Sequence, residues 1–333
     1  STQSRSSAAS DVYKRQRLGN IENELIEKYP DISFSFYDKA DNIPDNDKKE
    51  LEVLIGYDGE INERFIKSCP NLKWIAWYAT GVNNLPLEYI KNKGIILTNT
   101  RGIQSKQLSE YILTFILNDH KKMETSFINQ QKHIYDSTLT GKRLKDETIL
   151  FLGTGAIAQD TVKLLTPFEL KIIGASKTGK QKEGFNQTYE INELDKLLGE
   201  ADIIINTLPE TKETYHLLNK HHFQLMKEDT LFINVGRGTI VEEHDLIEIL
   251  KEKLIRHAYL DVFENEPLES EHPLYDLDNV TITAHITGND KENKKEATKI
   301  FERNLTRFLN KEEISENVVD LKAVSYTHLT LPT

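Results

Sequence analysis

The chain has 333 residues, of which 38% are hydrophobic and 29% are charged, so it is long enough for about two domains with apolar cores. Its 53 acidic and 42 basic residues give a formal net charge of −11, which argues against nucleic-acid binding as the main function. No apolar run approaches the length of about 18 residues that a membrane span needs. The single cysteine, Cys69, excludes an internal disulfide and a cysteine-based zinc site. We therefore expect a cytoplasmic protein that has no metal site and binds neither nucleic acid nor a membrane.

The two ends of the chain differ from its interior. Residues 1–16 are serine-rich and aperiodic, and residues 322–333 continue no helical or strand pattern. We interpret them as a non-native leader and a non-native tail, with ordinary disordered termini as the alternative. No function is assigned to either segment.

The interior alternates short β-rich runs with amphipathic helical stretches, which is typical of an α/β protein with parallel sheets. The predicted strands, in chain order, are 32–37, 53–57, 74–79, 95–99, 148–153, 171–175, 202–208, 231–235, 258–262 and 281–284. A long helix is expected over 105–131, because Leu108, Ile112 and Phe115 recur at helical spacing. Another long helix is expected over 290–309.

These two helices bracket the second set of strands and indicate two crossings of the chain between domains. Residues 104–286 would form one domain, inserted between the two parts of the other, 17–103 and 287–321. The predicted fold class is therefore α/β, with two doubly wound, Rossmann-like parallel-sheet domains.

A glycine-rich turn, GTGAIA (153–158), directly follows the apolar run that ends at Leu152 and precedes a helical run. In a dinucleotide-binding turn the first glycine allows the tight turn, the second admits the pyrophosphate, and the third position must be small. Ala158 satisfies the last need, and the helix N-terminus would direct its free N–H groups at the phosphates. The predicted cofactor-binding turn consists of Gly153, Thr154, Gly155, Ala156 and Ile157. An ordinary turn between a strand and a helix is the alternative.

The position about 20 residues further on distinguishes NAD from NADP, because an acid there would bind the ribose 2′-hydroxyl of NAD. The chain has Ser176, Lys177 and Thr178 instead, with no acid. Two hydroxyls and an ammonium suit a 2′-phosphate, which a carboxylate would repel. We therefore predict NADP as the preferred cofactor and keep NAD, bound beside an ordinary polar turn, as the alternative.

Three later strands run into residues with catalytic potential. The first ends in Arg237 between two glycines, and its planar guanidinium could hold a carboxylate and polarise a keto oxygen. The second leads into an acidic loop with Glu266, and the third ends just before His285. Because both follow strands, Glu266 could orient the imidazole and favour its protonated form, as an acid–base pair requires. A turn-capping arginine and an incidental histidine are the alternatives.

Seven segments together resemble the family of D-isomer-specific 2-hydroxyacid dehydrogenases. They occur in family order and at family spacing, and the resemblance extends from about Arg17 to Leu321. The segments are TGVNN (80–84), SKQLSEYIL (105–113), LFLGTGAIA (150–158), NTLPETKET (206–214), NVGRG (234–238), DVFENEP (261–267) and AHITG (284–288). Each motif is weak alone, but the set is highly specific.

The resemblance implies a role for each matching residue. Arg237 would bind the substrate carboxylate and carbonyl, His285 would donate the proton, and Glu266 would pair with that histidine. Asp261 would hold the nicotinamide carboxamide. The turn that would offer N–H groups to the substrate carboxylate is Thr80, Gly81 and Val82. The other positions that would lie along the cofactor are Thr207, Pro209, Val235, Gly236, His285 and Gly288.

The implied reaction is hydride transfer between a nicotinamide cofactor and a small 2-oxoacid, with a D-2-hydroxyacid, or glycolate from glyoxylate, as the product. We predict an NADPH-preferring reductase of the glyoxylate/hydroxypyruvate type that forms a homodimer. Residues 104–286 would be the cofactor domain, inserted into the substrate domain. A phosphoglycerate dehydrogenase-like enzyme and a non-catalytic dinucleotide-sensing protein are the alternatives.

Three features depart from the family pattern. The strand with which members usually begin is not recognisable before Arg17, and Ala158 stands where a third glycine is usual. Ser176 and Lys177 replace the acid after the second strand of the cofactor domain. The lack of a long C-terminal extension argues against the longer, feedback-regulated phosphoglycerate dehydrogenases.

Overall fold

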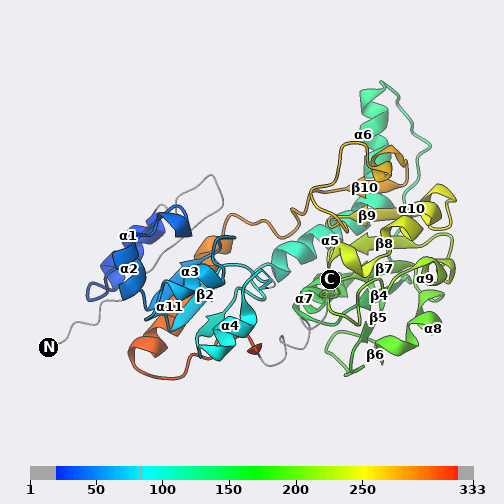
Figure 1. Cartoon of the computed structure of the whole chain (residues 1–333). Coiled ribbons are helices and arrows are strands. Elements are labelled where there is room, and N and C mark those ends of the chain that lie inside the picture. The colour runs from blue at the N-terminus through cyan, green and yellow to red at the C-terminus, as the bar shows by residue number, and fades with distance from the viewer. Residues whose placement is uncertain (1–19, 83, 322–333) are drawn as a thin grey trace. The chain divides into compact units, whose positions relative to one another are not determined.

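The computed structural model describes residues 20–82 and 84–321, so the predicted leader and tail lie outside the described residues. The chain divides into two compact units (Figure 1). The continuous unit comprises Gln104–Asp290, and the discontinuous unit combines the chain up to Ile103 with the chain from Lys291. Residues 287–290, which we had placed with the substrate domain, thus fall in the continuous unit. Every strand pair within the two sheets is parallel, which confirms the α/β class.

The discontinuous unit contains α1 (Asn20–Lys28), α2 (Asp45–Glu50), β1 (Val53–Gly56), α3 (Glu63–Lys67), β2 (Trp74–Trp77), α4 (Leu87–Asn92), β3 (Ile96–Thr98) and α11 (Asn293–Leu309). The continuous unit contains α5 (Ser105–His120), α6 (Met123–Gln131), β4 (Thr148–Leu152), α7 (Ala156–Leu165), β5 (Lys171–Ser176), β6 (Gln187–Glu190), α8 (Leu194–Leu198), β7 (Ile203–Asn206), α9 (Lys220–Gln224), β8 (Leu231–Asn234), α10 (Glu243–Lys251), β9 (His257–Leu260) and β10 (Val280–Ile282).

The sheet of the continuous unit has the order β10-β9-β8-β7-β4-β5-β6. The chain therefore winds outward from β4 in one direction and from β7 in the other, so the order reverses between these two strands. In such sheets, ligands bind outside the carboxyl ends of the strands at the point of reversal. Leu152 pairs with Asn206 and Asn234 with Leu260, so the strands end level and their turns emerge at one edge.

The central strands are buried on both faces, as their uninterrupted apolar runs require. Ile149 and Phe151 of β4 belong to one hydrophobic cluster, together with residues of α5 and α7. Leu150 and Leu152 belong to the cluster on the other face, with residues of α8 and α10. This alternation follows from the two-residue period of a strand, and it packs the sheet against helices on both faces up to its carboxyl edge.

The discontinuous unit has a parallel sheet of order β1-β2-β3. Trp74 of β2 is fully buried, and its ring stacks on Phe301 of α11 at 5.2 Å between centroids. Thr98 forms an isolated bridge with Val318. The two chain segments of this unit therefore share one core and one sheet edge.

The strand expected over 32–37 is wrong, since the structure assigns none there. Alternating aromatic residues suggested it, but those rings pack with one another: Phe34 stacks on Phe36 at 6.2 Å and also contacts Tyr29. β1 forms the edge of the described three-stranded sheet, and this segment does not extend it. In the other unit, β6 was not predicted, because its residues Gln187–Glu190 carry little apolar pattern.

The single helix expected over 105–131 is also wrong, because the chain forms two helices, α5 and α6. Lys122, between them, adopts the left-handed region with φ of 55°. This conformation ends helices, although glycine is its usual occupant, so the sequence carries no signal for the break. The final helix begins at Asn293 rather than at residue 290.

Candidate active site

The glycine turn after β4 fits the phosphates of a dinucleotide. Gly153 has φ of 94°, and a Cβ there would lie 2.9 Å from the Thr207 hydroxyl oxygen, so a side chain is excluded. At Gly155, by contrast, an added Cβ would meet nothing within 4 Å. Gly155 and Ala156 are exposed at the start of α7, whereas Thr154 is buried and Ile157 is half-buried. Open space before a helix N-terminus, with backbone N–H groups facing it, is what a pyrophosphate requires.

Buried amides fix the neighbouring strand ends. The Asn206 side chain donates a hydrogen bond to the Asn234 side chain at 2.9 Å and accepts one from the Leu208 backbone N–H at 3.1 Å. Asn234 in turn accepts from the Gly236 N–H at 3.2 Å. A Cβ at Gly236 would lie 2.8 Å from the Leu208 carbonyl oxygen. No role was predicted for the two asparagines, although both lie in predicted strands, and they are the last residues of β7 and β8.

The predicted cofactor positions near this edge occupy different environments. The Thr207 hydroxyl donates to the Leu152 carbonyl at 3.0 Å, which joins its loop to the glycine turn. Pro209 is exposed, Val235 is buried in the core, and Gly288 lies beside the Gln104 side chain. These residues line the carboxyl edge of the sheet or the loops that leave it.

The polar turn after β5 contains half-buried Ser176 and exposed Lys177 and Thr178. Lys177 has a carboxylate in its neighbourhood. The backbone N–H of Glu213, the Thr211 hydroxyl and the Lys177 ammonium together lower the pKa of the Glu213 carboxyl. The chain has no acid directly after this strand, but the fold brings Glu213 into the neighbourhood of Lys177 from the loop that follows β7.

His285 and Glu266 form a direct pair. The imidazole Nδ1 lies 2.7 Å from Glu266 Oε2, and the two side chains are 52% and 34% exposed. The other carboxylate oxygen of Glu266 accepts the Phe263 backbone N–H at 3.0 Å, which fixes the orientation of the carboxylate. Since a carboxylate only accepts, Nδ1 carries a proton, and Nε2 is the nitrogen left for a substrate.

Asp261 organises the turn that carries His285. Its buried carboxylate accepts the Ile286 backbone N–H at 2.9 Å, the Thr283 hydroxyl at 2.6 Å and the Thr287 hydroxyl at 2.5 Å. Its backbone carbonyl accepts the His285 N–H at 2.9 Å. These bonds hold His285 at φ of 52°, a left-handed conformation that is uncommon for residues other than glycine and that clusters at functional sites. The family resemblance implies a role of Asp261 toward the cofactor, whereas its role in holding this turn was not predicted.

Arg237 emerges from the end of β8, the strand that lies next to β9. It is half-buried, and its guanidinium donates to the Gly236 carbonyl at 2.7 Å. A Cβ at the following Gly238 would lie 1.9 Å from the Phe263 carbonyl carbon. The backbone of the arginine turn therefore lies directly against the loop that carries Glu266, and only glycine permits this approach.

The predicted substrate turn follows β2 in the discontinuous unit. Thr80 is half-buried, Gly81 is exposed and Val82 is buried. The Asn99 amide donates to the Thr80 carbonyl at 2.9 Å, and the Trp77 indole donates to the Gly81 carbonyl at 2.8 Å. These bonds fix the backbone orientation of the turn. Asn83 of the same motif lies outside the described residues.

The continuous unit therefore joins a dinucleotide-type glycine turn with an imidazole–carboxylate pair and an arginine at adjacent strand ends. Such a combination is typical of a nucleotide-dependent oxidoreductase.

Comparison with known proteins identifies the family. Residues 113–287 match the model of the "D-isomer specific 2-hydroxyacid dehydrogenase, NAD binding domain". A glyoxylate reductase from Thermofilum pendens is 33% identical over 269 residues, which cover 79% of this chain and 79% of that protein. A D-3-phosphoglycerate dehydrogenase from Methanocaldococcus jannaschii is 32% identical over 279 residues, covering 82% of this chain but 52% of that protein.

A solved structure of a D-isomer specific 2-hydroxyacid dehydrogenase family protein from Aeromonas salmonicida has a TM-score of 0.82 and 28% identity to this chain. The match covers 96% of this chain and 100% of that one. The chain belongs to the D-isomer specific 2-hydroxyacid dehydrogenase family and is an oxidoreductase of that class. No helix among the described residues is long and apolar enough to span a membrane.

Proposed function

We propose that this protein reduces a small 2-oxoacid, of the glyoxylate or hydroxypyruvate type, to the 2-hydroxyacid with NADPH as the preferred electron donor. The observation that carries the proposal is the His285–Glu266 pair at 2.7 Å, with Nε2 left for the substrate, on the same sheet edge as the glycine turn. The glyoxylate reductases among its relatives support the choice of substrate class.

The proposed reaction needs a proton donor and a positive charge beside the substrate oxygen, and different side chains provide them. His285 gives the proton on Nε2 to the substrate oxygen, while Glu266 holds Nδ1 and stabilises the imidazolium before transfer. Arg237 binds the substrate carboxylate and offsets the negative charge that develops on the oxygen. By the family resemblance we also assign the backbone N–H groups of the turn Thr80, Gly81 and Val82 to the substrate carboxylate.

The cofactor would lie along the glycine turn, with Gly153–Ile157 at the pyrophosphate and Thr207, Pro209, Val235, Gly236 and Gly288 beside its nicotinamide half. Asp261 is also assigned to the nicotinamide end, next to the turn that it holds. When bound in its reduced form, the cofactor supplies the hydride. The 2′-phosphate would be bound by Ser176, Lys177 and Thr178. For this, the Lys177 ammonium must give up its electrostatic interaction with the Glu213 carboxylate and interact with the phosphate instead.

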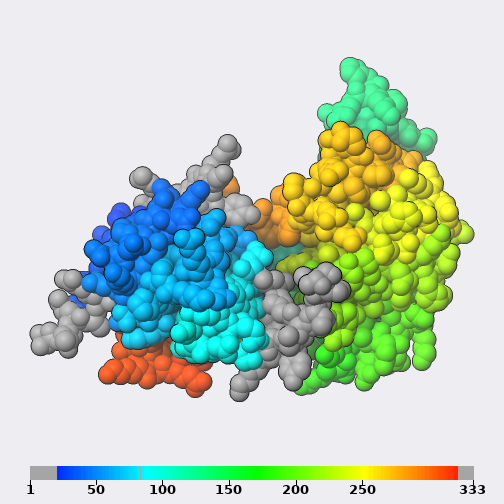
Figure 2. Space-filling view, viewed as in Figure 1, coloured from blue at the N-terminus to red at the C-terminus, as the bar shows by residue number. Residues whose placement is uncertain are grey.

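We also assign a homodimer, formed in part through α6. Met123, Phe127 and Ile128 on this helix are exposed, as are Ile134 and Tyr135 just after it. Figure 2 shows α6 and the following segment standing out from the surface of the continuous unit. An exposed apolar group of this kind is typical of a surface that another chain covers. The predicted cytoplasmic location stays a prediction.

The test of the proposed function is the loss of reduced-nicotinamide absorbance with NADPH and NADH in parallel, over glyoxylate, hydroxypyruvate, pyruvate, branched 2-oxoacids and 3-phosphohydroxypyruvate. Turnover of glyoxylate or hydroxypyruvate with NADPH supports the proposal. Faster turnover of 3-phosphohydroxypyruvate than of glyoxylate or hydroxypyruvate would favour the alternative, a phosphoglycerate dehydrogenase-like enzyme. Dinucleotide binding without any turnover, by folded protein, would contradict the enzymatic function.

Replacement of Lys177 tests the cofactor preference. Lys177→Ala removes the ammonium proposed to face the 2′-phosphate, so we expect the KM for NADPH to rise about tenfold while that for NADH stays the same. The matched control is Lys171→Ala, because Lys171 begins β5 at the opposite edge of the sheet. Equal changes of KM for both cofactors in Lys177→Ala would contradict the assignment.

A further inference from the structure

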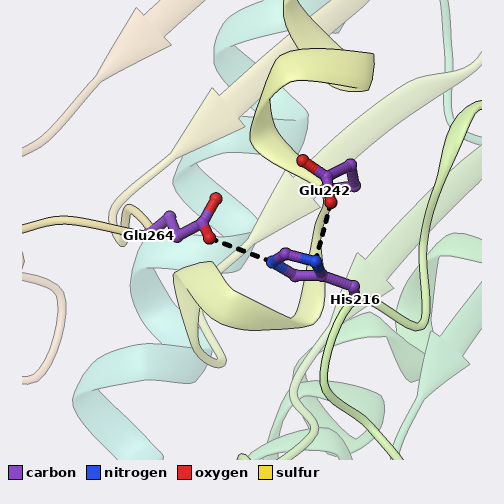
Figure 3. A group of neighbouring side chains, drawn as sticks. All are labelled: His216, Glu242 and Glu264. Carbon is purple, nitrogen blue, oxygen red and sulfur yellow. Dashed lines mark hydrogen bonds and ion pairs between the residues drawn. The ribbon is translucent and has the colours of Figure 1, made fainter.

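Another histidine–carboxylate cluster of the continuous unit consists of His216, Glu242 and Glu264 (Figure 3). His216 Nδ1 is 2.7 Å from Glu242 Oε2, and its Nε2 is 3.0 Å from Glu264 Oε1. All three side chains are partly buried. The three residues come from separate loops, after β7, after β8 and after β9, and no sequence motif joined them.

The geometry of this cluster favours hydrogen bonds between the imidazole and the two carboxylates over coordination of a metal ion. A metal ion takes one imidazole nitrogen, but here each ring nitrogen faces a different carboxylate, on different sides of the ring (Figure 3). A carboxylate accepts hydrogen bonds and cannot donate them when ionised. The arrangement is therefore one in which the imidazole joins Glu242 and Glu264 by hydrogen bonds, one at each ring nitrogen.

The backbone around His216 is held as firmly as its ring. Its φ is 49°, in the left-handed region, and its N–H donates to the Thr239 carbonyl at 2.8 Å. Tyr215 stacks on the imidazole at 3.9 Å between ring centroids. A left-handed residue that is neither glycine nor asparagine costs free energy, so surrounding contacts must hold it in place.

Glu264 connects this cluster to the catalytic pair. Its backbone N–H donates to Glu243 at 3.2 Å, and Glu243 also pairs with His272 at 3.2 Å. The preceding residue, Phe263, gives its N–H to Glu266, which holds His285. The side chain of Glu264 is thus anchored by His216 within the same short loop whose backbone orients the catalytic carboxylate.

We infer that His216 is a positioning residue for the reaction: by binding Glu264 and Glu242 together, it holds loop 263–266 so that Glu266 faces His285. The inference rests on the proposed function, because it assigns His216 an effect on the proton-transfer step through Glu266. His216 itself contacts neither substrate nor cofactor in this role. Its charged neighbours are Glu242 and Glu264, and Glu243, the first residue of α10, accepts the backbone N–H of Glu264.

The test compares His216→Gln and Glu264→Gln with wild type. Misalignment of a catalytic group by a fraction of an ångström slows the chemical step, so we expect kcat to fall about tenfold with both KM values within about twofold of wild type. His221→Gln is the matched control, because His221 pairs with Asp195 on an exposed surface at 3.2 Å. That variant should keep the wild-type kcat.

A cycle with Glu266 distinguishes positioning from general structural damage. If His216 acts through Glu266, adding His216→Gln to a Glu266→Ala background should cause no further loss of kcat. The same tenfold loss in that background, or an unchanged kcat in the single variant, would overturn the inference.

Hydrogen exchange gives a readout that does not require activity. The backbone amides of residues 263–266 should exchange at least about tenfold faster in His216→Gln, while those of β4 and β7 keep their rates. If no 2-oxoacid is reduced by wild type, the proposed function fails, and this local acceleration still decides whether His216 holds the loop. Unchanged exchange at 263–266 would overturn the inference on its own.

Discussion

Two imidazole–carboxylate pairs of the continuous unit have almost the same length but differ in exposure, and the proposed function uses only one of them. His285 and Glu266 are 2.7 Å apart, and His120 and Glu147 are 2.8 Å apart. The first pair is 52% and 34% exposed, the second 0% and 12%. Distance alone therefore does not identify a catalytic pair.

The two histidines differ in what their second ring nitrogen contacts. His120 Nδ1 donates to the Ile116 carbonyl at 2.9 Å, while Nε2 faces Glu147, so both nitrogens are committed inside the protein. His285 commits only Nδ1 to Glu266. A catalytic acid needs a nitrogen that the fold has not already used, and His120 has none.

Charge balance separates the two pairs further. Burial disfavours the imidazolium of His120, but hydrogen bonds to Asp119 and Glu147 outweigh burial and raise its pKa. Burial likewise opposes ionised Asp119, yet the His120 hydrogen bond and the charge of Arg256 lower its pKa to about 2. The buried pair belongs to an ion network that stabilises the end of α5, where the chain turns into α6.

The largest expected effect is on catalysis. His285→Gln removes the proton donor and should lower kcat about a thousandfold, within the range of general acid catalysis, while the unfolding midpoint stays at the wild-type value. Steady-state kinetics and thermal unfolding of the same preparation measure both. A clearly lower unfolding midpoint in His285→Gln would show that the exposed pair also stabilises the fold. The contrast between the exposed pair and the buried His120–Glu147 pair would then disappear.

The buried pair should respond in the opposite way. His120→Leu leaves Glu147 with Lys142 at 2.8 Å but without its buried partner, so we expect unfolding free energy to fall by about 3 kcal/mol. Denaturant unfolding measures the loss. The kcat of the folded fraction should stay close to wild type, and a selective loss of kcat instead would mean that the network serves the reaction.

The pH dependence of stability sharpens the contrast. Because the folded pKa of His120 is above its ordinary value of 6.5, its contribution is fully present below pH 6.5 and is lost as pH rises through the folded pKa. The contribution of Asp119 has the opposite sign: it is present above pH 3.8 and is lost as pH falls toward about 2. The stability difference between wild type and His120→Gln should therefore shrink as pH rises above 6.5. A difference that grows with pH would contradict the assignment of His120 as an imidazolium.

Sequence predicted those parts of the site in which local pattern and strand ends coincide. Gly153 and Gly155 follow a largely apolar strand, and Glu266 and His285 each come after another predicted strand, so their common edge was foreseeable. The family resemblance added their roles. The His216 cluster was not foreseeable, because its three members are separated along the chain and meet only through the order of the sheet.

The errors in the fold have a similar physical origin. The alternation of Phe34 and Phe36 is the pattern of a strand, yet a strand also needs a neighbour with free backbone groups. The break at Lys122 follows from a left-handed residue for which the sequence provides no glycine. Each feature is decided by partners distant in sequence, which a local pattern does not contain.

The discontinuous unit has a consequence for the order in which the molecule is made. Trp74 can stack on Phe301, and Thr98 can pair with Val318, only after the whole of Gln104–Asp290 has been synthesised. At about 5–20 residues per second, that interval lasts roughly ten to forty seconds. The continuous unit can complete its core during this time. The apolar strands β1–β3, by contrast, can bury the face that packs on α11 only after α11 has been synthesised. The continuous unit can therefore finish folding before the discontinuous unit, and the N-terminal strands stay without part of their core until α11 has been synthesised.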